Sequence, residues 1–115
     1  MPKIKLKLFA SLRELIDDTK EEEYDLKDGS TLMDFLIQYV PERHNNVSRK
    51  WNETLFEMEK NEVKFDNGVP ILKNYLILIN GKLYQFLTED GENPGFKYKL
   101  KDGDVVAILP PMGGG

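Results

Sequence analysis

The residues best suited to chemistry in this sequence lie at its C-terminal end, Pro110-Pro111-Met112-Gly113-Gly114-Gly115. Glycine has no Cβ, so the last three residues fit a channel too narrow for a side chain, and nothing beside the carbonyl carbon of Gly115 hinders attack on it. Pro110 and Pro111 fix φ and lack an N–H, so a preceding strand cannot continue through them. The pattern favours a terminal carboxylate as the reactive group, carried on a thin tail (residues 110–115). A frayed terminus is the alternative.

Side-chain catalysis has few candidates elsewhere. The sequence contains no cysteine and one histidine, His44, which excludes disulfides, a thiol nucleophile and a zinc site of the usual Cys/His type. His44 lies in a polar stretch with no suggested partner, and we expect a solvated loop residue rather than a general base. No metal site and no bound cofactor are predicted.

Length and composition predict one domain over residues 1–115. A chain of 115 residues that is 40% hydrophobic and 31% charged can bury one core. Sixteen basic and twenty acidic residues give a net charge of −4, and the basic residues are scattered, so no nucleic-acid partner is expected. Apolar runs such as 75–79 are far shorter than the roughly 20 residues that span a bilayer. The N-terminus lacks a signal-peptide pattern. A cytoplasmic protein without membrane contact is expected.

Four stretches predict strands. Residues 3–8 alternate lysine with Ile or Leu, which is typical of a half-buried strand. Residues 21–26 are a weaker candidate, an edge strand whose acidic start stays solvated. Residues 75–79 are apolar at every position, which favours a strand deep in the sheet, and Asn80-Gly81 is typical of a hairpin turn. Residues 105–109 form the final strand.

One main helix is predicted between the second and third strands. Ser30 or Thr31 can accept a backbone N–H at its start, and Asp34 in the first turn is favoured by the helix dipole. Pro41 marks its end or lies just past it. Apolar residues follow at the 3–4 spacing of a helix with one buried face: Leu32, Phe35, Leu36, Tyr39 and Val40.

The stretch 42–74 is harder to assign. Val47, Trp51, Leu55 and Phe56 are spaced as on one side of a second helix. The order of elements predicts an α+β, β-grasp arrangement: a mixed four- to five-stranded sheet packed on one main helix, with residues 42–74 as an insertion after that helix.

Four motifs occur in a set order along the chain: Phe9-Ala10-Ser11-Leu12-Arg13-Glu14, Asp28-Gly29-Ser30-Thr31-Leu32, Ile79-Asn80-Gly81-Lys82, and Leu100 to Val105 leading into the tail. Together they resemble the small subunit of molybdopterin synthase, a ubiquitin-like sulfur-carrier protein. The stretch 42–74 is longer than compact members of that family need. Gly113 stands where the family often has another small residue.

The resemblance implies a carrier rather than an enzyme. A separate ubiquitin-activating-type adenylyltransferase, using ATP, adenylates the carboxylate of Gly115. A sulfur donor then displaces AMP and leaves a C-terminal thiocarboxylate. The large subunit of molybdopterin synthase accepts the tail, from Pro110 to Gly114, and the sulfur enters the dithiolene that holds molybdenum or tungsten.

Three alternatives remain open at this point. The first is a sulfur carrier for thiamin or tRNA thiolation, although Phe9 to Glu14 and the two prolines favour the molybdopterin pathway. The second is a ubiquitin-like modifier joined through Gly115 to lysines of other proteins. The third is a ubiquitin-like interaction domain with an inert tail.

A partner surface is expected beside the tail, because the resemblance implies binding through the sheet face. Phe9 and Leu109 are candidates for an exposed apolar patch, with a core position as the alternative for each. Arg13 and Glu14 could pair across the interface or with each other, or lie solvated on the surface.

Overall fold

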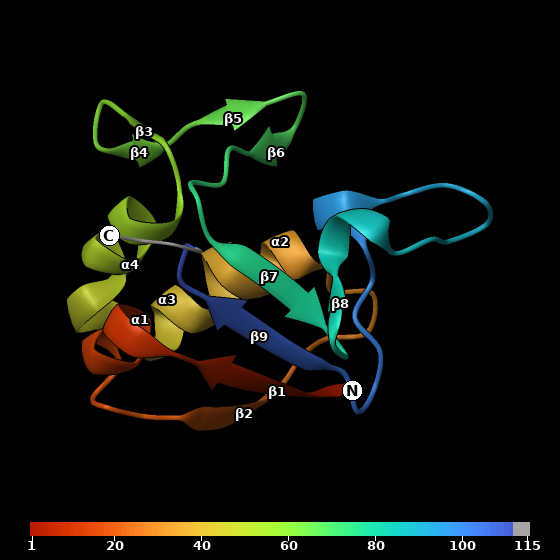
Figure 1. Cartoon of the computed structure of the whole chain (residues 1–115), viewed down its shortest axis with the longest axis horizontal. Helices are drawn as coiled ribbons and strands as arrows, with labels where there is room; N and C mark the ends of the chain where they lie inside the picture. The colour runs from red at the N-terminus through yellow and green to blue at the C-terminus, as the bar shows by residue number, and fades with distance from the viewer. Residues whose placement is uncertain (112–115) are drawn as a thin grey trace.

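A five-stranded mixed sheet forms the body of the protein (Figure 1). The computed structural model describes residues 1–111. From edge to edge the sheet runs β2, β1, β9, β7, β8, with β1 and β9 parallel and the other neighbouring pairs antiparallel. The first and last strands therefore lie side by side, which confirms the predicted β-grasp arrangement. The strands span β1 (Lys3–Leu8), β2 (Glu21–Asp25), β7 (Leu76–Ile79), β8 (Lys82–Leu83) and β9 (Val105–Leu109).

One face of this sheet is buried and the other is open. Side chains alternate along a strand, and on β1 the buried ones are Ile4, Leu6 and Leu8; we call this the inner face. On β7, Ile77 and Ile79 are buried while Leu76 and Leu78 remain partly exposed on the outer face. β7 lies between β9 and β8, so it is an interior strand as predicted, although its outer-face side chains are only partly buried.

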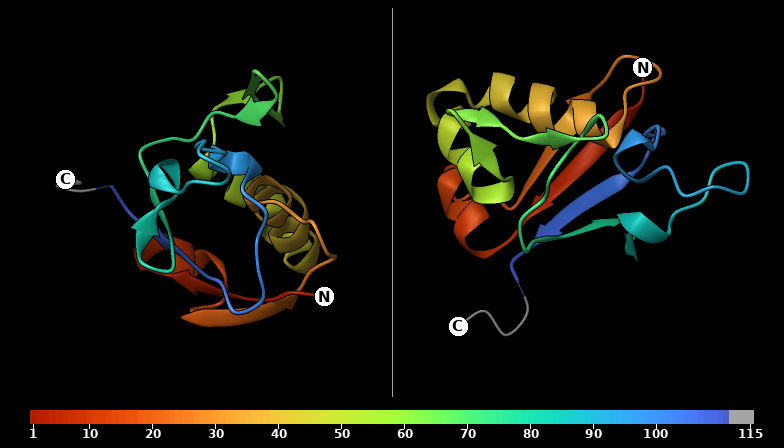
Figure 2. Two further views of the ribbon diagram at one scale, coloured as in Figure 1. Left: turned by 90° about the vertical axis from the view of Figure 1, so that its right-hand side faces the viewer. Right: turned by 90° about the horizontal axis from the view of Figure 1, so that it is seen from above.

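The main helical segment covers the inner face (Figure 2). It comprises α2 (Leu32–Asp34), a π-helical turn (Phe35–Tyr39) and α3 (Val40–Arg43). Thr31 and Asp34 form a capping box: the Asp34 N–H donates to Thr31 Oγ1 at 3.1 Å and the Thr31 N–H donates to Asp34 Oδ2 at 3.0 Å.

Pro41 lies within this helical segment, so the predicted helix end was wrong. Proline in a helix interior lacks the N–H that would bond four residues back, and its ring clashes with that carbonyl. Here the Val40 N–H bonds to the Phe35 carbonyl, five residues back, in the turn just before Pro41. The wider π-helical turn lets the chain carry the proline and continue to Arg43.

The second predicted helix is confirmed as α4 (Ser48–Leu55). Trp51 and Leu55 are buried in the same core cluster as the sheet residues. The Trp51 indole N–H also donates to the Leu36 carbonyl at 2.9 Å. The start of the stretch predicted as an insertion is therefore part of the core.

Two short hairpins follow α4 and lie together beyond the end of that helix (Figure 1). The first pairs β3 (Met58–Glu59) with β4 (Glu62–Val63), and the second pairs β5 (Phe65–Asp66) with β6 (Val69–Pro70). The Glu57 N–H donates to the Ile71 carbonyl at 2.9 Å, which closes the base of the excursion. The remaining short elements are α1 (Ala10–Leu15) and three 3-10 turns at 45–47, 84–86 and 95–97.

Candidate functional site

The candidate tail leaves the sheet from β9, which lies between β1 and β7. Pro110 and Pro111 follow the strand and are partly buried. Met112, Gly113, Gly114 and Gly115 lie outside the described residues, so the predictions made for them remain predictions.

Polar contacts at the opposite end of β9 fix where the strand begins. Asp104 is only 6% exposed. One of its carboxylate oxygens accepts from Asn80 Nδ2 and the other from the Lys101 N–H, both at 2.8 Å. Asn80 Oδ1 in turn accepts from the Val105 N–H at 2.9 Å. The Asn80-Gly81 hairpin turn, with φ values of 52° and 82°, is thereby bonded to the start of the tail-bearing strand.

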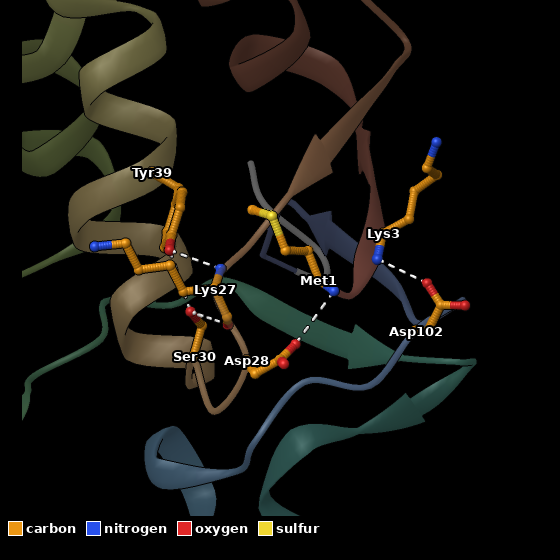
Figure 3. Close-up of polar contacts among 7 residues, drawn as sticks. All are labelled: Met1, Lys3, Lys27, Asp28, Ser30, Tyr39 and Asp102. Atoms are coloured by element: carbon orange, nitrogen blue, oxygen red, sulfur yellow. Dashed lines mark hydrogen bonds and ion pairs between the residues drawn. The ribbon is translucent and has the colours of Figure 1, made fainter.

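Further contacts at this end hold the start of β1 (Figure 3). The Lys3 N–H donates to Asp102 Oδ1 at 2.8 Å, and the amino group of Met1 lies 3.3 Å from Asp28 Oδ1. These contacts lie at the end of the sheet remote from the tail.

An apolar row crosses the outer face where the tail begins. Leu76 of β7 pairs with Leu109 of β9 on this face. The register of β1 against β9 is given by the buried pair of Leu8 with Ile108. Continuing the latter register by one residue places Phe9 beside Leu109, on the other side from Leu76. Phe9 is 41% exposed and so is not a core residue. Leu76 and Leu109 are partly exposed. The structure thus brings together the two predicted apolar interface residues, Phe9 and Leu109.

The outer face has an apolar half and a charged half. The apolar half is formed by β7 and β9, where Leu78 pairs with Ala107 next to the row just described. The charged half is formed by β1, whose outward side chains are Lys3, Lys5 and Lys7. A surface of this kind can bury apolar area against a partner while charges at its border set the orientation.

The backbone is strained beside the tail. Ala10 has a φ of 52°, in the left-handed region that costs a non-glycine residue about 1 kcal/mol or more. This residue turns the chain from β1 into α1 immediately after Phe9. The next residue, Ser11, has its hydroxyl 3.4 Å from the hydroxyl of Tyr75, the residue just before β7. Sequence patterns gave no signal for either feature.

Arg13 lies on α1 and is partly buried, whereas Glu14 is exposed. Within residues 1–111 neither side chain forms an ion pair, so the two do not pair with each other there. A shallow depression of about 320 Å³ lies nearby between α1 and α4, lined by Ser11, Glu14, Leu15, Lys50 and Thr54.

His44 is not the solvated loop residue that the sequence predicted. Its Nε2 lies 2.9 Å from both carboxylate oxygens of Glu22, and the two side chains are only 14% and 13% exposed. The pair joins the end of α3 to β2, which β1 separates from the tail-bearing strand β9. His44 is therefore placed to hold the fold together.

Among residues 1–111, no group of His, Asp or Glu side chains is placed to hold a metal ion. In the same part of the chain, no helix is both long and apolar enough to cross a membrane.

Comparison with known protein families shows which family the chain belongs to. The model of the ThiS family matches residues 6–115, which is almost the entire chain. The chain belongs to the ThiS family. The match includes all four motifs and the glycine tail. Comparison with curated proteins gives no match.

Similar solved structures agree with this family. The chain is 28% identical to a Pyrococcus furiosus protein assigned as molybdopterin converting factor, subunit 1, with a TM-score of 0.61, covering 97% of this chain and 100% of that one. It is 26% identical to small archaeal modifier protein 1 from Methanosarcina acetivorans, with a TM-score of 0.67 and coverage of 100% and 98%. Urm1 from Trypanosoma brucei, at 18% identity, a TM-score of 0.57 and coverage of 98% and 95%, shares the fold.

The ThiS-family protein is thus a ubiquitin-like sulfur carrier or modifier. Small carriers of this kind are generally not catalysts themselves.

Proposed function

We propose that the protein carries sulfur as a thiocarboxylate on Gly115 and donates it in molybdopterin biosynthesis, as the small subunit of molybdopterin synthase. The observation that carries the proposal is the family match, which extends through the terminal glycines. The likeness to a molybdopterin converting factor subunit supports the pathway. So do the motif Phe9 to Glu14 and the two prolines before the glycines.

A free carboxylate is a poor electrophile, and activation by a partner enzyme solves this problem. Adenylation joins the Gly115 carboxylate to the α-phosphate of ATP and releases pyrophosphate. Sulfide then attacks the acyl carbon, the bond to the phosphate oxygen breaks, and AMP leaves with that electron pair. The product is a thiocarboxylate. The glycines allow close approach to the acyl carbon, and the catalytic residues belong to the partners.

The apolar row of Phe9, Leu76 and Leu109 supports a docking role for the surface around the tail. Its exposed area lies directly beside the point where the chain leaves the sheet. An activating-type adenylyltransferase and the large synthase subunit would each bind this surface in turn and take the tail into their own active sites. One tail would then serve two partners in turn.

Intact mass measurement tests the proposal. The protein is incubated with the activating enzyme, ATP and sulfide, and one oxygen should be replaced by sulfur. A chain lacking Gly114 and Gly115 is the matched control and should stay unmodified. The thiocarboxylate form is then mixed with the large synthase subunit and the pterin precursor, and a dithiolene product is expected. Thiocarboxylate formation without a dithiolene would redirect the proposal to thiamin or tRNA thiolation; absence of the mass change would refute the carrier function.

A second candidate function is protein modification. It is favoured by the likeness to small archaeal modifier protein 1, because the same activated glycine can react with a lysine amine as well as with sulfide. Pull-down of the tagged chain from cells would then yield higher-mass species with Gly115 in isopeptide linkage. Digestion and mass spectrometry identify that linkage directly, and its absence would count against this function.

A further inference from the structure

The edge strand β2 has backbone groups that nothing in residues 1–111 pairs with. β2 is the outermost strand of the sheet and bonds only to β1. The Leu8 N–H donates to the Lys20 carbonyl, and the Leu26 N–H donates to the Pro2 carbonyl. Bonded pairs alternate in an antiparallel ladder, so residues 20, 22, 24 and 26 face β1. The N–H and C=O groups of Glu21, Glu23 and Asp25 point outward.

The side chains of these three residues give the open edge a negative charge. Glu21, Glu23 and Asp25 are exposed on the outer face. The surrounding stretch 17–28 contains seven acidic and two basic residues. Pairing of β2 with β2 of a second copy would place carboxylates opposite carboxylates, which is destabilising. A second copy is therefore not the partner that this edge fits.

β1 shows which kind of strand does fit β2. Its sequence alternates lysine with apolar residues, and in the register Lys3 is opposite Asp25, Lys5 opposite Glu23 and Lys7 opposite Glu21. Lys5 Nζ also lies 2.9 Å from Glu21 Oε1. A strand on the other side of β2 would meet the same three acidic side chains on the outer face.

On the inner face, residues beside β2 limit which side chains an added strand could place there. Arg43 lies over the Tyr24 ring, with its guanidinium carbon 3.7 Å from the ring centroid. Glu22 is taken up by His44 and by the Tyr24 hydroxyl. The inner-face positions of an added strand would therefore pass Arg43, and uncharged residues suit them.

We propose that the open edge of β2 binds an extended segment of a partner protein, with lysine or arginine at alternate positions and uncharged residues between them, as a sixth strand. Main-chain hydrogen bonds to Glu21, Glu23 and Asp25 hold it, and their carboxylates select its charge. This surface is separate from the tail, so binding at the β2 edge does not depend on sulfur transfer.

Amide hydrogen exchange on the full chain tests the pairing directly. The probe is a short blocked peptide of alternating lysine and threonine. The outward amides of Glu21, Glu23 and Asp25 exchange fast in the free protein and should become protected when the peptide is added. The amides of Glu22 and Tyr24, already bonded to β1, should change little. Binding without protection of the three outward amides would mean general charge attraction and would overturn the proposal, as would absence of binding.

Two variants of Glu23 distinguish the contribution of the backbone N–H to peptide binding from that of the side-chain charge. Glu23→Pro removes one outward N–H without breaking the ladder to β1, and it should weaken peptide binding about tenfold. Glu23→Gln keeps the N–H and should weaken binding only about two- to threefold. An acidic peptide of alternating glutamate and threonine should not bind. Equal effects of the two variants, or equal binding of the two peptides, would contradict strand addition. The exchange measurement on the unmodified chain decides the matter if Glu23→Pro fails to fold.

Discussion

Phe9 is the side chain on which the proposed docking surface depends most. It is 41% exposed beside Leu109, so its replacement removes contact area from a partner and little from the core. We expect Phe9→Ser to lower the rate of thiocarboxylate formation at limiting carrier concentration about five- to tenfold, the effect of losing one important interface residue. The thermal unfolding midpoint should stay nearly constant.

Phe86 provides a matched control, because it is 62% exposed but follows β8, the strand at the opposite edge of the sheet from β2 and β1. Phe86→Ser should leave the rate unchanged. If both variants lower the rate alike, general surface hydrophobicity rather than a specific patch at the tail is responsible, and the docking surface is misplaced.

Asp104 is the residue that connects the hairpin turn to the tail-bearing strand. Asp104→Ala leaves Asn80 Nδ2 and the Lys101 N–H without their acceptor in a part-buried site. We expect a loss of about 2 to 3 kcal/mol in the free energy of unfolding, measured with urea. Asp102→Ala, which removes an exposed bond to the Lys3 N–H, should cost less than about 1 kcal/mol. Equal losses of unfolding free energy in the two variants would show that the buried Asp104 contacts stabilise the fold no more than an exposed hydrogen bond does.

At the scale of elements, β2 is joined to the helical layer through Tyr24. Its ring packs edge-on against Phe35, with the centroids 5.0 Å apart, and its hydroxyl donates to Glu22 Oε1 at 2.9 Å. Burial, with the hydrogen bond and charge of Glu22, raises the pKa of Tyr24 well above its usual value. Burial also raises the pKa of Tyr84.

These raised pKa values predict a loss of stability in alkali. Above the pKa of an unfolded tyrosine, near 10, the folded state keeps its phenolic protons while the unfolded state releases them. The free energy of unfolding should therefore be unaffected below about pH 10 and fall as the pH rises further. Tyr24→Phe should make that fall less steep, and Tyr84, Lys5 and Lys101, whose pKa values are also raised, contribute to the remainder. Urea unfolding between neutral pH and pH 11 measures both slopes, and an unchanged slope in Tyr24→Phe would contradict this assignment.

The elements that the sequence predicts well are those encoded by neighbouring residues. The alternation of lysine and apolar residues in β1 and the Asn80-Gly81 turn depend on local chemistry. The features missed depend on distant partners. The contact of His44 with Glu22 spans 22 residues of sequence, and no local sequence pattern predicts it. The helix passes Pro41 because a π-helical turn precedes it, which the 3–4 spacing does not show.

The candidate site was predictable in its residues but not in its geometry. The glycines and prolines of the tail and the motif beginning at Phe9 are evident in the sequence. That Phe9 lies beside Leu109 follows only from the parallel pairing of β1 with β9, which local patterns leave open. The left-handed conformation of Ala10, an alanine at a position typical of glycine, has no sequence signal.

At the scale of the whole molecule, the stretch 42–74 divides into a part that the fold needs and a part that we expect it to tolerate losing. Trp51 is fully packed in the common core, and Trp51→Ala should cost about 3 to 5 kcal/mol. The two hairpins instead leave the core at Glu57 and return at Ile71, whose backbones are hydrogen-bonded to each other. Their strands are two residues long and carry an exposed Phe65.

Replacement of residues 58–70 by two glycines should therefore give a folded protein, because the new loop joins two points that already touch. The loss of the partly buried Val63 and Val69 and the buried Pro70 should lower the free energy of unfolding by about 2 to 4 kcal/mol. If the surface around Phe9 and the tail suffices for activation, the shortened chain should form the thiocarboxylate at the rate of the full chain. A folded but unreactive shortened chain would instead place part of the activating enzyme's binding surface on the hairpins, and far-UV circular dichroism beside the intact mass distinguishes that outcome from unfolding.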